Sequence, residues 1–128
     1  MGPYLLIALG GVAGANVRYL VSTWAANRVG VDFPYGTLLI NASGSVLMGF
    51  FLTMVGGGGG HDPDARFLVA TGFLGTYTTF STFTYETIAL MRRAAIRASL
   101  INVIGSATSG IGGAAVGIAL ANMFARGW

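Results

Sequence analysis

The 128-residue sequence has no cysteine, no lysine and few charged residues of either sign. Without cysteine it can form neither a disulfide framework nor a thiol-based catalytic or metal site. Charged residues make up 9% of the chain, against about 25% in a typical soluble domain. Hydrophobic residues make up 54%, and the mean hydropathy is +0.71. So little polar surface cannot solvate a globule of this size, and the composition predicts a protein whose solvent is lipid.

All the basic charge comes from seven scattered arginines, which give a formal net charge of +3. No basic run is present, so we do not expect nucleic acid to be a partner. The apolar stretches also contain no nucleophile paired with a base, and the sequence does not predict an enzyme.

Four stretches reach the length of about 20 mostly apolar residues that a membrane-spanning helix needs. They cover residues 4–26, 35–55, 67–91 and 98–124. The sequence therefore predicts an all-α integral membrane protein, with residues 1–128 forming a single transmembrane domain of four helices. Glycines 56–60 lie between the second and third stretches, and we expect a flexible turn there, because each glycine costs a helix about 1 kcal/mol.

Small residues recur four positions apart along three of these stretches, a spacing that lets membrane helices approach closely. The pairs are Gly10 with Gly14, Ser45 with Gly49, Ser106 with Gly110, and Gly113 with Gly117. Close helix packing accounts for most of the 21 glycines in the chain.

Polar residues of the predicted spans gather in one half of the membrane. At 1.5 Å per residue, Arg18, Asn41 and Glu86 lie roughly 5, 6 and 10 Å from the centres of their spans, all toward the same side. Asn102 and Ser106 fall in that half as well. Intramembrane ionisable residues suggest function by default. For Arg18 and Glu86 a structural ion pair is an equal alternative, and a proton-coupled carboxylate is a further interpretation of Glu86.

This one-sided distribution suggests that a subunit supplies half of a polar route and that a second, inverted copy supplies the other half. Four arginines flank the spans on one side and two on the other, which is a weak positive-inside bias. A weak bias permits insertion in both orientations, and so permits an antiparallel, dual-topology homodimer. The alternative is a single orientation with the four-arginine side in the cytoplasm.

The centre of the third span predicts a broken helix. Gly72 and Gly75 weaken the helix, and the threonines at 76, 78 and 79 offer the backbone alternative partners. Carbonyl groups released by such a break can hold a cation, and a two-fold axis there would suit a dehydrated Na⁺. Phe80 and Phe83 follow, three residues apart on one helix face. Their positive ring edges could face an anion, although ordinary core or lipid-facing aromatics are the alternative.

The sequence resembles the Fluc (CrcB-type) fluoride channel family over its whole length. The resemblance rests on segments 10–19 (GGVAGANVRY), 36–41 (GTLLIN) with Gly44, 72–75 (GFLG) and 78–83 (TTFSTF), followed by Glu86. It implies an antiparallel homodimer with two pores in a bacterial-type plasma membrane. Its activity would be passive, fluoride-selective conduction that exports cytoplasmic fluoride and relieves fluoride toxicity.

The resemblance also assigns roles to individual residues. The carbonyls of Gly75 and Thr78 would hold a central Na⁺ that is not transported, while Phe80 and Phe83 would form the aromatic lining that fluoride passes. Asn41 would be the polar residue beside that lining. Further hydroxyl candidates are Ser81, Thr82 and Ser106. Asn102 stands one turn before Ser106, where family members often carry tyrosine.

The alternative function is that of a small multidrug-type transporter, which is also an antiparallel dimer of short four-helix subunits. That chemistry requires a membrane-embedded glutamate in the first helix. The first span of this chain has Arg18 and no acidic residue, which disfavours the alternative.

Overall fold

The structure is a computed structural model that describes residues 2–57 and 62–126. Every regular element in this part of the chain is helical. The elements are α1 (Pro3–Val29), α2 (Tyr35–Gly57), α3 (Pro63–Ala65), the π-helical η1 (Arg66–Leu74), α4 (Gly75–Tyr77), α5 (Phe80–Arg92) and α6 (Ile96–Arg126).

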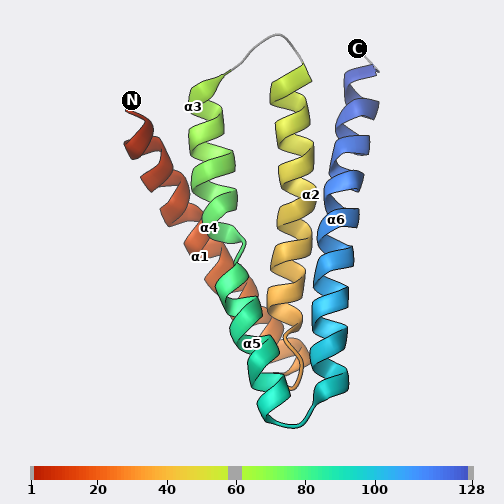
Figure 1. The fold of residues 1–128 in the computed structure, drawn as a ribbon. Coiled ribbons are helices and arrows are strands. Elements are labelled where there is room, and N and C mark those ends of the chain that lie inside the picture. The colour runs from red at the N-terminus through yellow and green to blue at the C-terminus, as the bar shows by residue number, and fades with distance from the viewer. Residues whose placement is uncertain (1, 58–61, 127–128) are drawn as a thin grey trace.

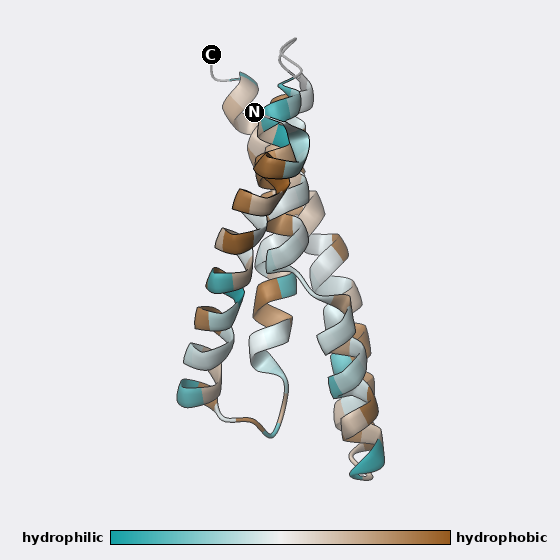
Figure 2. Ribbon diagram, turned by 90° about the vertical axis from the view of Figure 1, so that its left-hand side faces the viewer, coloured by the Kyte–Doolittle hydropathy of each residue, from teal (hydrophilic) through white to brown (hydrophobic). Residues whose placement is uncertain are grey.

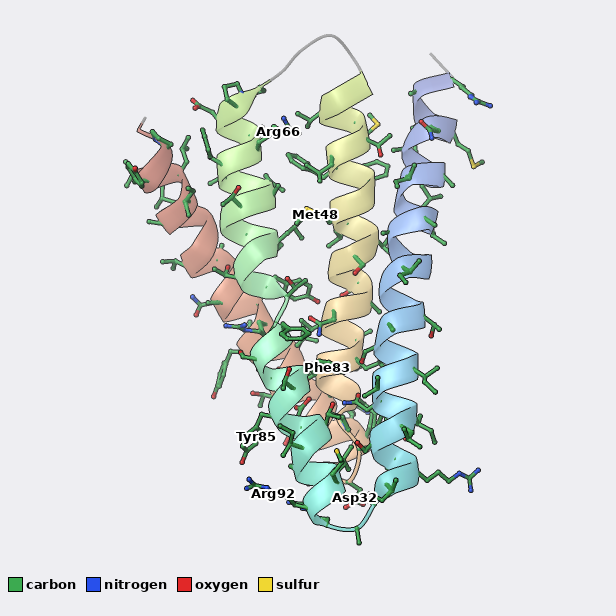
Figure 3. All side chains as sticks on the ribbon, viewed as in Figure 1. Asp32, Met48, Arg66, Phe83, Tyr85 and Arg92 are labelled. Carbon is green, nitrogen blue, oxygen red and sulfur yellow. The ribbon has the colours of Figure 1, made fainter. Side chains whose placement is uncertain are left out.

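The helices run back and forth between two ends of an elongated bundle (Figure 1). α1 begins and α6 ends at one end, and the chain turns at residues 30–34 and 93–95 at the other. α1 packs along η1 and α4, whereas α2 packs along α6. Arg66 lies at the end that holds the termini, and Asp32 and Arg92 lie at the opposite end (Figure 3).

Among the described residues, three helices are long and apolar enough to cross a membrane: α1, residues 35–56 of α2, and α6. Apolar residues recur along the length of the bundle (Figure 2). Many are exposed on the single chain; Ile111 and Met123 on α6, for example, are 76% and 70% exposed. An apolar surface this extensive fits contact with lipid or with another membrane helix.

Glycines bring α2 and α6 into backbone contact, as the small-residue spacing predicts. A Cβ atom at Gly117 would overlap the Val46 carbonyl and crowd the backbone nitrogen of Phe50. A Cβ atom at Gly49 would overlap the Ala114 carbonyl. The prediction of close approach is therefore confirmed for this pair of helices.

Glycines also bring α1 and η1 into close contact. A Cβ atom at Gly10 would overlap the Leu68 carbonyl, and one at Gly14 would overlap the Phe73 carbonyl. Gly72 faces Gly10, and its own Cβ would lie 2.8 Å from the Ile7 carbonyl. Gly72 thus packs closely against α1, and it lies within the π-helical segment η1.

The helices extend a few residues beyond the predicted apolar spans, because their ends include polar and glycine residues. α2 continues through Gly56 and Gly57, so the expectation that the whole glycine run leaves the helix is wrong for these two residues. Two glycines at a helix end cost little when the rest of the helix is well packed. Glycines 58–60 lie outside the described residues.

The predicted third span, residues 67–91, is divided in the structure. The helix ends at Tyr77 and a new helix starts at Phe80. Gly75 has helical dihedral angles (φ −63°, ψ −32°), so the interruption follows the glycines and falls on two threonines.

Candidate ion-binding site at the helix break

The interruption between α4 and α5 consists of Thr78 and Thr79 in extended conformation. Thr78 has φ −76° and ψ 157°, and Thr79 has φ −149° and ψ 120°. The Thr79 hydroxyl accepts a hydrogen bond from the Thr82 backbone N–H at 3.2 Å and so caps α5. A threonine in extended conformation is a good N-cap, which explains why α5 starts directly afterwards.

Asn41 on α2 satisfies the backbone of the interruption. Its Nδ2 donates to the Thr79 carbonyl at 2.9 Å, and its Oδ1 accepts from the Thr79 N–H at 2.8 Å. Thr79 is only 8% exposed, so both backbone groups would otherwise lack partners. An unpaired buried polar group is costly. By pairing with both backbone groups of Thr79, Asn41 therefore stabilises the extended conformation.

Carbonyl groups at the end of α4 lose helical partners as a result. In a continuous helix the Thr79 N–H would bond to the Gly75 carbonyl, but here it bonds to Asn41. Within the part of the chain that the structure describes, the Thr78 carbonyl accepts one long hydrogen bond, 3.4 Å, from Nη1 of Arg18 on α1. Among residues 2–57 and 62–126, no three His, Asp or Glu side chains lie together as a metal site.

The aromatic pair lies directly after the interruption. The ring centroids of Phe80 and Phe83 are 5.7 Å apart, with the ring planes tilted by 44°. Phe80 is 78% exposed on the single chain. It lines an open cavity of about 290 Å³, which we call the Asn41 cavity. The other residues lining it are Asn41, Gly44, Ser45, Met48, Thr78 and Thr79.

A second open cavity, which we call the Arg18 cavity, is lined by two of the three hydroxyl candidates. Its volume is about 380 Å³, and Ser81 and Thr82 line it together with Arg18. Thr79 borders both cavities. The structure therefore gathers Asn41, Phe80, Ser81, Thr82 and Arg18 around one point of the chain, the extended residues between α4 and α5.

Glu86 does not pair with Arg18. Glu86 Oε1 accepts a hydrogen bond from Thr37 Oγ1 on α2 at 2.9 Å, while Arg18 contacts the Thr78 carbonyl. The alternative of a structural ion pair between the two is therefore wrong, because each polar head has a different partner. Glu86 Oε2 is buried and has no hydrogen-bond partner among the described residues. Glu86 also borders a cavity of about 260 Å³ that shares Ser22, Thr37 and Thr82 with the Arg18 cavity.

Ser106 and Asn102 lie on α6 and line neither of the two named cavities. The Ser106 hydroxyl is buried without a hydrogen-bond partner among the described residues, so it has a free donor. Asn102 is 1% exposed, and its Nδ2 donates to Thr87 Oγ1 on α5 at 3.0 Å.

Sequence reasoning missed Thr37 and the structural part played by Asn41 and Thr79. Thr37 lies one helical turn before Asn41, and this i, i+4 spacing on a charge-free span could have indicated a polar face. The Ser43 hydroxyl, hydrogen-bonded to the Tyr77 hydroxyl at 2.9 Å, was also missed. No sequence signal pairs residues this far apart.

Comparison with known proteins shows the family to which the chain belongs. The family model described as "CrcB-like protein, Camphor Resistance (CrcB)" matches residues 5–118. The chain belongs to the CrcB family. It is a multi-pass membrane protein, as its apolar helices also indicate.

Relatives with the printed name "Fluoride-specific ion channel FluC" cover nearly the whole CrcB-family chain. The protein from Synechococcus sp. (strain JA-2-3B'a(2-13)) is 42% identical over 118 residues, which are 92% of this chain and 91% of the relative. The protein from Roseiflexus sp. (strain RS-1) is 40% identical over 119 residues, 93% and 96% of the two chains. The protein from Legionella pneumophila (strain Lens) is 44% identical over 110 residues, 83% and 82%.

Proposed function

We propose that this CrcB-family protein is a passive, fluoride-selective channel that lets cytoplasmic fluoride leave the cell. The observation that carries the proposal is the gathering of an aromatic pair, hydroxyls, an amide and a guanidinium at one helix break. An anion in the membrane needs such donors to replace its hydration shell. The relatives named as fluoride-specific channels support fluoride as the ion.

The donor inventory of the break fits a small anion. The Asn41 amide group has two N–H donors, and the Thr79 carbonyl takes one of them, so one remains for a ligand. The hydroxyls of Ser81 and Thr82 and the ring edges of Phe80 and Phe83 add further positive partners at the break. The Ser106 hydroxyl on α6 is a further donor outside the break. Arg18 supplies a fixed positive charge beside them, which lowers the cost of an intramembrane anion.

Passive conduction is sufficient for fluoride detoxification. Neutral hydrogen fluoride enters through lipid and ionises inside the cell, where the charged fluoride is trapped. A selective pore then lets fluoride flow out down its electrochemical gradient, without nucleotide or a coupled ion.

The functional unit is an antiparallel homodimer in which the divided third segment completes the fourth membrane crossing. The polar site occupies one half of the subunit, and Phe80 is largely exposed on the single chain. A second, inverted copy would bury Phe80 and supply the polar residues for the other half of the ion path. Because the chain has no cysteine, Asp62→Cys creates a single label site at the end that holds the termini. Membrane-impermeant maleimide should reach half of the copies from each face; labelling from one face alone would exclude this arrangement.

A central Na⁺ that is not transported completes the proposal. The Gly75 carbonyl, released by the Asn41–Thr79 bonds, and the weakly paired Thr78 carbonyl fit a hard cation that takes only oxygen ligands. The inverted copy supplies an equivalent pair, and the bound ion supplies positive charge near the anion route. Replacing Na⁺ with N-methyl-D-glucamine should lower the melting temperature of the dimer, and an unchanged melting temperature would contradict the site.

The direct test of mechanism is current through a planar lipid bilayer that contains the purified protein. Under a fluoride gradient the current should reverse at the fluoride equilibrium potential, and a chloride gradient should not move that potential. Electroneutral flux that requires a proton gradient would instead favour the small multidrug-type transporter.

A further inference from the structure

Asn102 lies at the contact between α6 and the helix that carries both pore phenylalanines. It is among the most deeply buried side chains of the described residues, at 1% exposed. Burying an amide in a membrane helix is costly unless the amide finds a partner. Its partner is Thr87 Oγ1 at 3.0 Å, so this polar residue holds two helices together and does not face an open cavity.

The Thr87 hydroxyl connects Asn102 to the backbone of Phe83. The Thr87 hydroxyl has one donor, which it gives to the Phe83 carbonyl at 2.7 Å, while its lone pair accepts from Asn102. One turn earlier on α6, the Ser99 hydroxyl donates to the Thr87 carbonyl at 3.2 Å. α6 therefore binds both the side chain and the backbone of Thr87, which lies one helical turn after Phe83 on α5.

Little else fixes the rotation of α5. Leu90 is the one buried hydrophobic residue of this helix, and its other polar anchors, Thr79–Asn41 and Glu86–Thr37, all lead to α2. Without the bond from Asn102, the remaining hydrogen bonds named here would be those to α2 and the one from Ser99 to the Thr87 carbonyl. In a membrane, where apolar side chains gain nothing from leaving lipid for protein, such bonds set helix orientation.

We propose that Asn102 is a positioning residue, which sets the place of the Phe83 ring through Thr87 and is not itself a ligand of the transported ion. The inference rests on the proposed function, since it assigns to Asn102 the alignment of the aromatic lining.

A double-mutant cycle in fluoride-loaded liposomes separates the two roles. Asn102→Leu and Thr87→Val should each lower fluoride efflux about fivefold to tenfold, the loss expected from one inter-helix hydrogen bond. The double variant should lose no more than either single variant, because both remove the same bond. Thr87→Ser, which keeps the hydroxyl, should restore efflux to near the wild-type rate.

Asn122→Leu is the matched control, because Asn122 lies on the same helix but is exposed. It should leave efflux unchanged. If Asn102 contacted the ion directly, Asn102→Leu would abolish efflux while Thr87→Val left it intact. That result would overturn the proposal.

A spectroscopic readout tests positioning without any conduction. With 4-fluorophenylalanine in place of Phe83, in fluoride-free buffer, the ¹⁹F resonance should shift in Asn102→Leu and in Thr87→Val and stay in place in Asn122→Leu. An unmoved resonance in folded Asn102→Leu dimer would refute the positioning role. If the resonance shifts in the variants but the wild-type protein conducts no fluoride, the proposed function is refuted and the positioning role of Asn102 is not.

Discussion

The pairing of α2 with α6 and the attachment of α5 show two different ways of holding membrane helices together. α2 and α6 touch backbone to backbone at Gly49 and Gly117, where no side-chain atom fits between them. α5 has one buried hydrophobic residue, Leu90, and is attached through side-chain hydrogen bonds to Asn41, Thr37 and Asn102. Glycine contacts thus build the frame, and hydrogen bonds place the helix that carries the proposed pore residues.

This difference gives the two regions different sensitivities. Close backbone contact depends on shape, and any added atom forces the helices apart. An inter-helix hydrogen bond in a membrane contributes roughly 0.6–2 kcal/mol, so its loss shifts a helix without dissolving the bundle. Changes in the frame should prevent the bundle from assembling, whereas changes around α5 should alter conduction in an intact copy of the proposed dimer.

The largest effect is expected from Gly117→Val, which places a branched side chain against the Val46 carbonyl. Overpacking of this kind costs about 3 kcal/mol, and we expect no monodisperse dimer in size-exclusion chromatography. Gly112→Val, on the same helix with open space around it, is the control and should purify normally. Normal yield of both variants would mean that backbone contact does not hold the frame.

The double variant Phe80→Ile/Phe83→Ile should abolish fluoride efflux while the dimer still purifies. Isoleucine keeps bulk but lacks a positive ring edge, and two lost ring contacts correspond to a fall of about a hundredfold. Phe→Met at the same positions should retain partial efflux, because the sulfur is polarizable.

The frame offers a matched control for this experiment. Phe50 and Phe124 form an edge-to-face pair with ring centroids 6.0 Å apart. Phe50→Ile should lower stability modestly and leave efflux near the wild-type rate. Equal efflux in the Phe50 variant and the Phe80/Phe83 double variant would place the pore elsewhere.

Asn41→Leu should lower efflux about tenfold and destabilise the dimer by about 1–3 kcal/mol, because both buried backbone groups of Thr79 lose their partner. Thermal unfolding in detergent and liposome efflux together check this expectation. Ser43→Ala, two residues along α2, removes the hydroxyl contact to Tyr77 and local bonds to the Leu39 and Ile40 carbonyls, but leaves the Thr79 backbone paired. It should have a smaller effect on efflux. The reverse ranking would show that Asn41 does not stabilise the break.

The smallest effect is expected from Thr37→Val, which removes the hydrogen bond to Glu86 at nearly constant volume. We expect a roughly twofold change in efflux and a loss of about 0.6–1 kcal/mol. Thr53→Val on the same helix removes only a local bond to the Gly49 carbonyl and should be silent. A Thr37→Val dimer without any efflux would make Glu86 a direct part of the route.

The sequence predicts features of this protein that depend on composition and local spacing. Apolar stretches located α1, α2 and α6, and small residues four apart located the contacts at Gly49 and Gly117. The spacing of Phe80 and Phe83 predicted a shared face, and their rings do lie together. These features follow from helical period and side-chain size alone.

Features that depend on long-range partners could not be read from the sequence. The interruption lies at Thr78–Thr79, two of the threonines that the sequence indicates, and not at the glycines. Its exact place depends on Asn41, 38 residues away, which pairs with the Thr79 backbone. Depth alone suggested an ion pair of Arg18 with Glu86, but the rotation of each helix gives these residues other partners. Helix depth can be counted from sequence, whereas helix rotation is set by packing.

The most direct test of the central claim is a paired efflux measurement on liposomes that contain the wild-type protein, with no proton gradient. Potassium fluoride fills one set of vesicles and potassium chloride the other, and valinomycin balances the charge. The account predicts rapid fluoride release, measured with a fluoride electrode, while chloride stays almost fully retained. Equal release of both anions, or fluoride release only after a proton gradient is imposed, would contradict it.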